Sequence, residues 1–206
     1  MVRLNLVGVP ESAALILTEL LMEIEESLPG LLRGFYLVGS IPLGDFYDKK
    51  SDIDFIADCN YLPRENEFEL LRKIHIKINS KYPKPDLSGC YILLDSVRNR
   101  DVTNTPIVSF HEGRMKYDLF DLAPIALSEF KNCSHTIFGK LPSEFDININ
   151  SSTINEFMLE NINSYWRSWI SDHSNLRKKW LILFFFSRFT EWGVLGVARQ
   201  LYTLKT

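Results

Sequence analysis

The stretch FYLVGSIPLGDFYDKKSDIDFIAD, residues 35–58, decides the expected fold of this chain. It opens with an apolar run that ends at Gly39 and Ser40, a pattern typical of a buried strand that stops at a tight turn. It closes with a second strand in which Asp52 and Asp54 alternate with apolar residues. Because successive side chains of a strand point to opposite faces, the two carboxylates share one face while their neighbours enter the core.

This pair of carboxylates predicts a metal site. Two carboxylates on one strand face repel each other unless a cation lies between them. Magnesium prefers oxygen ligands and commonly takes one or two carboxylates together with the phosphates of a substrate. An Asp-x-Asp pair by itself is more often a solvated loop charge or a helix cap, and it is the turn at residues 39–40 that favours the metal site. We therefore expect Asp52 and Asp54 to hold one or two Mg²⁺ ions.

The turn itself predicts a phosphate site. Gly39 has no Cβ, so the backbone can approach a ligand closely. Ser40, followed by Ile41 and Pro42, is typical of a helix N-cap with proline in the first turn. Backbone N–H groups at the start of a helix attract phosphate oxygens. The turn and the acidic strand together indicate a site for a polyphosphate and its metal.

The combination of Gly39 and Ser40, Gly44 and the run Ser51 to Asp54 resembles the motif of the nucleotidyltransferase superfamily that includes DNA polymerase beta. More narrowly, the chain resembles the bacterial aminoglycoside adenylyltransferases of the streptomycin/spectinomycin type. The later segment EWGVLGVARQLYTLKT, residues 191–206, is similar to the helix of that family whose arginine, here Arg199, faces the nucleotide phosphates. The resemblance implies an α+β nucleotidyltransferase fold, with a mixed sheet flanked by helices, followed by a C-terminal helical bundle.

The resemblance also implies a reaction, in which a hydroxyl attacks the α-phosphate of ATP and pyrophosphate leaves. The acceptor would be an aminoglycoside-like, hydroxylated and cationic small molecule, which would make the protein an antibiotic-resistance enzyme. The nucleotide would be bound by Gly39, Ser40, Ser51 and Arg199. The drug would be contacted by Trp169, Glu191 and Trp192.

The third strand departs from the family pattern. The family takes a third carboxylate, as metal ligand or general base, from the next strand, and Ser88 occupies that position here. Asp86 lies two residues earlier on the same strand face and is our candidate substitute as a catalytic residue. The alternative interpretation is a solvated loop aspartate.

Composition excludes several classes of protein. The chain has 206 residues, of which 46% are hydrophobic and 24% charged, with a net charge of −3, as in ordinary globular proteins. We expect no nucleic-acid partner from this charge. The most apolar run, residues 180–186, is too short to span a bilayer, and no secretory signal is visible, so we expect a cytoplasmic protein without a membrane partner. The three cysteines have no paired spacing that would indicate disulfides or zinc.

The order of elements predicts two domains, a nucleotidyltransferase domain over residues 1–145 and a helical substrate- and nucleotide-contacting domain over 146–206. In the first we expect helices over residues 10–28 and 63–81, a third strand over 89–95, an irregular excursion over 98–114 and a further strand over 115–122. The chain stops at Thr206, inside or just past the arginine helix, so we expect an incomplete helical domain. Its open apolar face favours self-association.

Two functions of different classes follow. The first is a magnesium-dependent adenylyltransferase, favoured by the intact turn and by the pair Asp52 and Asp54. The second is a catalytically impaired or truncated relative that binds nucleotide or a protein partner without turnover, favoured by Ser88 and by the lack of the lysine that the family carries shortly beyond Arg199. Release of pyrophosphate from ATP distinguishes the two.

Overall fold

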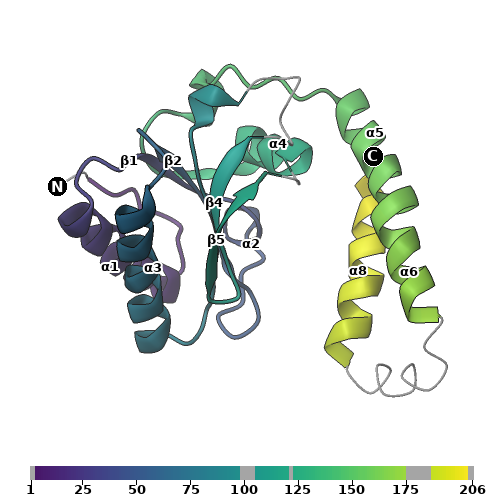
Figure 1. Ribbon diagram of the computed structural model, residues 1–206, viewed down its shortest axis with the longest axis horizontal. Helices are drawn as coiled ribbons and strands as arrows, with labels where there is room; N and C mark the ends of the chain where they lie inside the picture. Colours follow the sequence, from purple (N-terminus) through teal and green to yellow (C-terminus); the bar gives the residue numbers. More distant parts are fainter. Residues whose placement is uncertain (1–2, 98–104, 121–122, 175–186, 204–206) are drawn as a thin grey trace. The chain divides into compact units, whose positions relative to one another are not determined.

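The computed structural model describes residues 3–97, 105–120, 123–174 and 187–203. Contacts between residues divide the chain into two compact units, Met1–Asn148 and Ile149–Thr206, called here the sheet unit and the helical unit (Figure 1). The first contains every strand that the structure describes, and the second contains only helices among its described residues.

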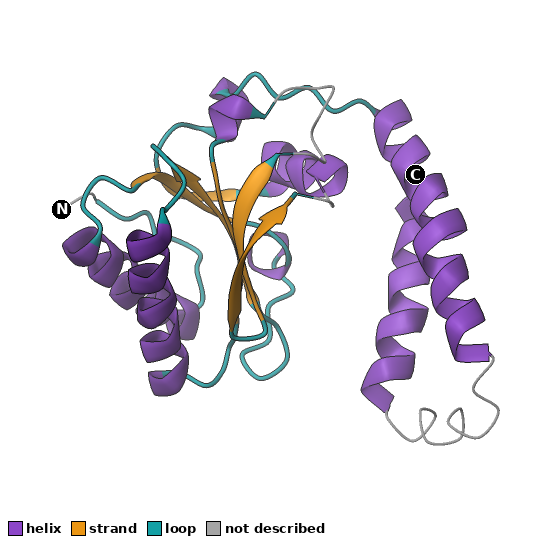
Figure 2. Ribbon diagram, viewed as in Figure 1, coloured by secondary structure: helices purple, strands orange, loops and turns teal. Residues whose placement is uncertain are grey.

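The sheet unit is built around one six-stranded sheet with the strand order β5-β4-β3-β2-β1-β6 (Figure 2). Its elements in chain order are α1 (Glu11–Ser27), β1 (Leu32–Leu37), α2 (Ser40–Leu43), β2 (Ile53–Cys59), α3 (Glu65–Lys81), β3 (Leu87–Ile92), η1 (Leu94–Ser96), β4 (Pro106–His111), β5 (Arg114–Leu119), α4 (Ala123–Cys133), β6 (His135–Phe138) and η3 (Pro142–Glu144). Strands β2 and β3 are parallel, whereas the other neighbouring pairs are antiparallel. The prediction of an α+β fold with a mixed sheet is confirmed.

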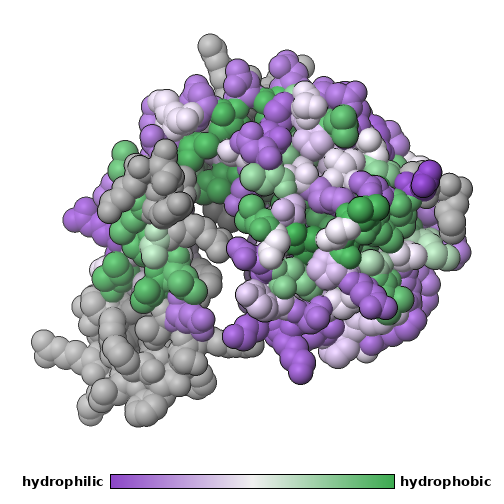
Figure 3. All heavy atoms as spheres, turned by 180° about the vertical axis from the view of Figure 1, so that it is seen from behind, coloured by the Kyte–Doolittle hydropathy of each residue, from purple (hydrophilic) through white to green (hydrophobic). Residues whose placement is uncertain are grey.

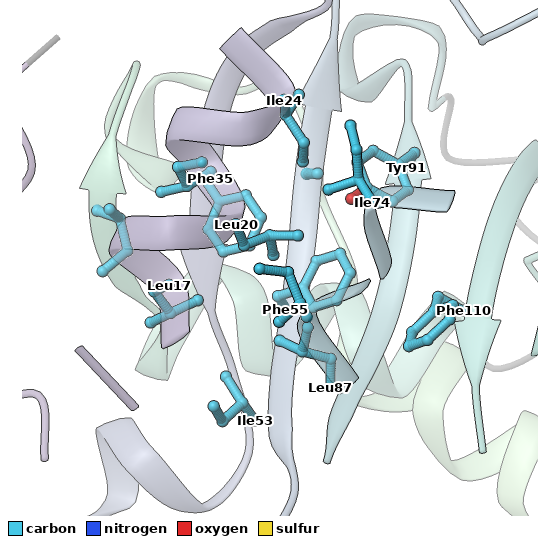
Figure 4. Close-up of a cluster of buried hydrophobic side chains, with 14 of the residues drawn as sticks. Leu17, Leu20, Ile24, Phe35, Ile53, Phe55, Ile74, Leu87, Tyr91 and Phe110 are labelled. Atoms are coloured by element: carbon cyan, nitrogen blue, oxygen red, sulfur yellow. The ribbon is translucent and has the colours of Figure 1, made fainter. Parts of the chain in front are cut away.

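One face of the sheet packs on α1 and α3 and holds a cluster of buried apolar side chains (Figure 4). Leu17, Leu20 and Ile24 recur at helical spacing on α1, so they form one buried stripe. On the sheet, Phe35 and Phe55 stack with their ring centroids 5.0 Å apart. Ile53, Phe55 and Ala57 of β2 belong to this cluster, so the residues between them point to the opposite face.

On the opposite face, the alternate residues of β2 are Asp54, Ile56 and Asp58. Asp58 is only 1% exposed and accepts hydrogen bonds from Arg33 Nε at 2.7 Å and from the Leu94 backbone N–H at 3.0 Å. A buried carboxylate with these charged and neutral donors serves to hold β1, β2 and η1 together. Asp58 is therefore structural, whereas Asp54 lies near the other end of the strand.

The hairpin of β4 and β5 corrects one prediction. We expected residues 98–114 to be irregular, but within the described part β4 spans Pro106–His111. It turns into β5 through Glu112 and Gly113, whose φ angles are 49° and 73°. Two residues with positive φ form the kind of short turn that joins antiparallel strands. The expected strand over 115–122 ends at Leu119, and residues 121–122 lie outside the described residues.

The helical unit consists of α5 (Ser151–Asn161), the π-helical turn η4 (Ile162–Trp166), α6 (Arg167–Ser174) and α8 (Ser187–Thr203). Asn150 caps α5, because its side chain accepts a hydrogen bond from the Thr153 N–H at 2.8 Å. Gly196 lets α8 approach Trp166 closely, since a Cβ at Gly196 would lie 2.5 Å from the indole ring. The apolar run at residues 180–186 lies outside the described residues.

Several large apolar side chains of the helical unit are exposed, and Figure 3 shows apolar side chains on the surface of this unit. They are Leu159, Tyr165, Ile170, Val194, Leu195 and Leu201. Self-association through such a surface stays a prediction. None of the helices in the described ranges is both long and apolar enough to cross a bilayer.

Candidate functional site

The turn after β1 brings Gly39 against Asp54. The backbone N–H of Val38 donates to the carbonyl oxygen of Asp54 at 3.0 Å, which continues the pairing of β1 with β2 up to the turn. Gly39 has a φ of 69°, and a Cβ built on it would lie only 2.5 Å from Asp54 Oδ2. Two features of this position therefore require glycine, the backbone conformation and the nearby carboxylate. The sequence predicted close approach of a ligand here, whereas the structure shows close approach of a carboxylate.

Ser40 differs from its predicted role as a helix cap. Gly39 is the N-cap of α2, Ser40 is its first residue, and no side chain caps the helix. A glycine can adopt the positive φ that this strand-to-helix turn requires, so the cap falls one residue earlier than expected. The Ser40 Oγ atom is buried and has no hydrogen-bond partner among the described residues. A buried hydroxyl without a partner is costly, so this atom is suited to bind a ligand oxygen.

Asp52 directly precedes β2, and Ile53 and Phe55 are buried as the alternation requires. The pleat therefore places the Asp52 and Asp54 side chains on the same face. Partial burial raises the pKa of the Asp52 carboxyl. The charges of Asp86 and Glu112 raise this pKa further, whereas those of Lys84 and His111 lower it. Ionised Asp52 is thus penalised, and a bound cation would relieve that penalty.

Asp86 lies beside Asp52, just before β3. The Ile53 N–H donates to the Asp86 carbonyl oxygen at 2.7 Å, and the Asp86 carboxylate is paired with the Lys84 ammonium. β3 begins at Leu87, two residues earlier than expected, so Ser88 belongs to the strand. The carboxylate that we expected as a third catalytic group therefore has a lysine partner in this structure.

Ser88 pairs with Asp54 in the parallel register of β2 and β3. Its Oγ lies 3.0 Å from Nδ1 of His111, at the end of β4. Sequence reasoning missed His111, because it assigned residues 98–114 to an irregular segment. The signal that could have revealed it is the apolar run of Ile107, Val108 and Phe110, which is typical of a strand.

Ser51 closes the loop that precedes β2. Its Oγ accepts a hydrogen bond from the Tyr47 N–H at 3.0 Å, and its own N–H donates to the Tyr47 carbonyl oxygen at 2.8 Å. These two bonds shape the backbone next to Asp52. Phosphate binding by Ser51 stays a prediction.

The other predicted residues belong to the helical unit. Trp169 on α6 is half-buried and packs against α8, where a Cβ at Gly193 would lie 2.9 Å from its indole ring. Glu191 on α8 is exposed. Trp192 and Arg199 also lie on α8, and their side chains are outside the described part of the structure. The substrate and phosphate roles of these four residues stay predictions.

The donor set at the end of β1 and the start of β2 fits magnesium. Asp52 and Asp54 offer hard carboxylate oxygens, and Ser40 adds a buried hydroxyl. Within the described ranges, no group of three or more His, Cys, Asp or Glu side chains is arranged to hold a metal ion. A two-carboxylate site of this kind suits an ion that completes its shell with water and substrate phosphates.

Comparison with known proteins shows the fold. No protein-family model and no curated protein sequence matches this chain. The structure is similar to the crystal structure of spectinomycin adenyltransferase AAD(9) from Enterococcus faecialis with ATP and spectinomycin. The TM-score is 0.62 at 16% sequence identity, over 79% of this chain and 71% of that chain. The chain therefore has a nucleotidyltransferase-like fold.

Proposed function

We propose that this protein is a magnesium-dependent nucleotidyltransferase that transfers AMP from ATP to a hydroxyl of a small molecule. One observation carries the proposal. The Asp54 carboxylate lies against Gly39 in a turn whose next residue, Ser40, has a buried hydroxyl without a partner. A carboxylate beside an unsatisfied donor is an arrangement that a metal-bound phosphate would complete.

Each residue of the turn has a role in this proposal. Asp52 and Asp54 would hold magnesium, which when bound would supply neutralisation of negative charge on the reacting phosphates. The Ser40 hydroxyl donates to a phosphate oxygen. Ser51 and the backbone at Gly39 position the polyphosphate, and Arg199 is proposed, from the family resemblance alone, to bind phosphate.

The nature of the acceptor is supported by the structural neighbour. That adenyltransferase was crystallised with ATP and spectinomycin, so we propose ATP as the nucleotide and an aminoglycoside-like molecule as the acceptor. The net charge of −3 is compatible with a cationic drug. Trp169, Glu191 and Trp192 are the residues proposed to contact it, because aromatic faces and a carboxylate attract cations.

The test is the formation of an AMP adduct. The protein is incubated with ATP, Mg²⁺ and a panel of aminoglycosides and related aminocyclitols, and the products are analysed by mass spectrometry and for pyrophosphate. We expect one acceptor to gain the mass of one AMP, with an equal amount of pyrophosphate, and EDTA to stop the reaction.

The matched variants are Asp52→Asn and Asp54→Asn, with Asp146→Asn as the control. Removal of either metal ligand is expected to lower the rate at least about 100-fold, since the metal supplies several kcal/mol of transition-state stabilisation. Asp146 is an exposed aspartate outside the site, so the same chemical change there should leave the rate unaltered. Equal rates in all three variants would contradict the proposal.

A second candidate is nucleotide binding without turnover. It is favoured by the ion pair of Asp86 with Lys84, because that pairing leaves Asp86 less available as a base. In that case Mg·ATP binds and stabilises the protein against thermal unfolding, while no acceptor in the panel gains AMP.

A further inference from the structure

A row of polar residues crosses three strands next to the metal-binding pair. Asp54 on β2 is paired with Ser88 on β3. Gly89 is paired with Phe110 in the antiparallel register of β3 and β4, so Ser88 stands opposite His111. Directly paired residues point to the same face of a sheet. His111 therefore occupies the same face as Asp54, two strands away.

The ring of His111 is held by one specific contact. Ser88 Oγ lies 3.0 Å from its Nδ1, while the side chain as a whole is exposed. The short turn through Glu112 and Gly113, with both φ angles positive, follows directly, so His111 is the last residue of β4. One ring nitrogen is thus engaged by the sheet, which leaves Nε2 for a ligand.

Nucleotidyl transfer needs a group that accepts a proton from the attacking hydroxyl. Of the carboxylates near the turn, Asp52 and Asp54 are assigned to the metal, and Asp86 is paired with Lys84. A histidine is well suited to accept a proton near neutral pH, because its ordinary pKa lies close to the working pH. We propose that His111 is the general base of the transfer and that Ser88 positions its ring; this inference rests on the function proposed above.

The step balances as follows. Ser88 Oγ accepts the hydrogen of Nδ1–H, so the lone pair of His111 lies on Nε2. Nε2 takes the proton of the acceptor hydroxyl as the acceptor oxygen forms a bond to the α-phosphorus of ATP. The bond from that phosphorus to the bridging oxygen breaks, and pyrophosphate leaves with the electron pair. His111 is then a catalytic residue, and Ser88 is a positioning residue.

Charged residues of both signs lie next to His111, with Glu112 following it in the turn and Arg114 paired with it on β5. His111 and the acidic and basic groups around it act together on the Asp52 carboxyl. The groups that act on Asp52 together with His111 are Lys84 and Asp86 before β3 and Glu112 in the turn. In this proposal, the Ser88 contact selects the ring nitrogen that carries the hydrogen.

The first test reads the tautomer of His111 by ¹⁵N NMR of the histidine side chains at pH 8, with His111→Gln to assign the signal. The proposal requires hydrogen on Nδ1 in the wild-type protein and a shift of the hydrogen towards Nε2 in Ser88→Ala. Ser88→Thr keeps a hydroxyl and should keep the wild-type tautomer. Hydrogen on Nε2 in the wild-type protein would overturn the assignment, whatever the activity.

The second test separates binding from transfer. In His111→Gln we expect the rate of AMP transfer, to an acceptor from the panel or to water, to fall at least about 100-fold. Mg·ATP affinity should stay within about twofold of the wild type, because a base that acts on the acceptor does not bind the nucleotide. His135→Gln, a change at a histidine on β6, is the control and should keep the full rate.

The two tests also separate this proposal from the one on which it rests. A wild-type protein that binds no Mg·ATP would overturn the proposed function and the base together. A wild-type protein that transfers AMP, with an unchanged rate in His111→Gln, would overturn the base alone. A restored rate in His111→Gln on addition of imidazole would support a proton-transfer role specifically.

Discussion

At the scale of single residues, the Ser40 hydroxyl is expected to contribute to ATP binding but not to the stability of the folded protein. Its buried Oγ has no partner among the described residues, so the folded protein carries the cost of a desolvated hydroxyl. We predict that Ser40→Ala leaves the ligand-free protein as stable as the wild type or about 1 kcal/mol more stable. The same change should weaken ATP binding about tenfold or more, because a hydrogen bond to a charged group contributes about 1.5–3 kcal/mol.

Chemical denaturation and titration calorimetry measure these two quantities. Ser143→Ala, in the exposed turn η3, is the matched control and should change neither. Wild-type affinity for ATP in Ser40→Ala would show that the hydroxyl does not reach the nucleotide.

His75 makes the stability of the sheet unit sensitive to acid. Its ring is fully buried beside Phe110 and lies 2.6 Å from the Tyr91 hydroxyl, and burial lowers its pKa to about 3. Between its ordinary pKa of 6.5 and about 3, the unfolded chain binds a proton that the folded chain does not. The buried neutral His75 therefore causes no loss of folding free energy well above pH 6.5. Below that pH, this residue lowers the free energy of unfolding by about 1.4 kcal/mol per pH unit.

Unfolding free energies measured from pH 7 to pH 4 check this prediction. His75→Gln keeps a polar partner for Tyr91 but cannot be protonated, so its acid slope should be shallower by that amount. His135→Gln should keep the wild-type slope. Identical slopes in all three proteins would mean that His75 is protonated in the folded state.

At the scale of elements, the turn between β1 and α2 couples backbone geometry to the site. We predict that Gly39→Ala lowers the free energy of unfolding by about 1–3 kcal/mol, the usual cost of a strained backbone conformation. A Cβ at residue 39 would lie only 2.5 Å from Asp54 Oδ2, so the alanine would displace the Asp54 carboxylate. Magnesium-dependent ATP binding should therefore be lost.

Gly44, at the other end of the same short helix, is the control for this prediction. Its φ is 78°, but a Cβ there would meet nothing within 4 Å. Gly44→Ala should therefore have a similar backbone cost of about 1–2 kcal/mol while ATP binding persists. Denaturation and binding measured on both variants distinguish strain from displacement, and equal binding by the two would refute the role given to the Gly39 contact.

At the scale of the whole molecule, the proposed ligand should stabilise the folded chain by mass action. At a concentration of Mg·ATP about 100 times the dissociation constant, the expected gain is about 2.7 kcal/mol. For a chain of this length that corresponds to a rise in Tm of about 5–10 °C. Thermal scans with ATP alone, Mg²⁺ alone and both together should show the full rise only for the pair, and Asp54→Asn should abolish it.

The elements that sequence predicts well are those whose apolar residues repeat within one segment. Helix α1 was expected over residues 10–28 and spans Glu11–Ser27, and the alternation of Asp52 to Phe55 holds in β2. Such periodicity is local, because each buried side chain follows from its own position in the helix or strand. The strand β4 was missed, since the polar residues around it in sequence concealed a short run that is stabilised by its neighbours in the sheet.

The sequence by itself determined the α+β class and the strand pair around Gly39, and it predicts a shared face for Asp52 and Asp54. Only the tertiary structure decided that Gly39 accommodates the Asp54 carboxylate, that Lys84 pairs with Asp86, and that Ser88 holds His111. The physical reason is register: a carboxylate or a ring finds its partner across strands that are far apart in the chain, and periodicity within one segment carries no information on that alignment.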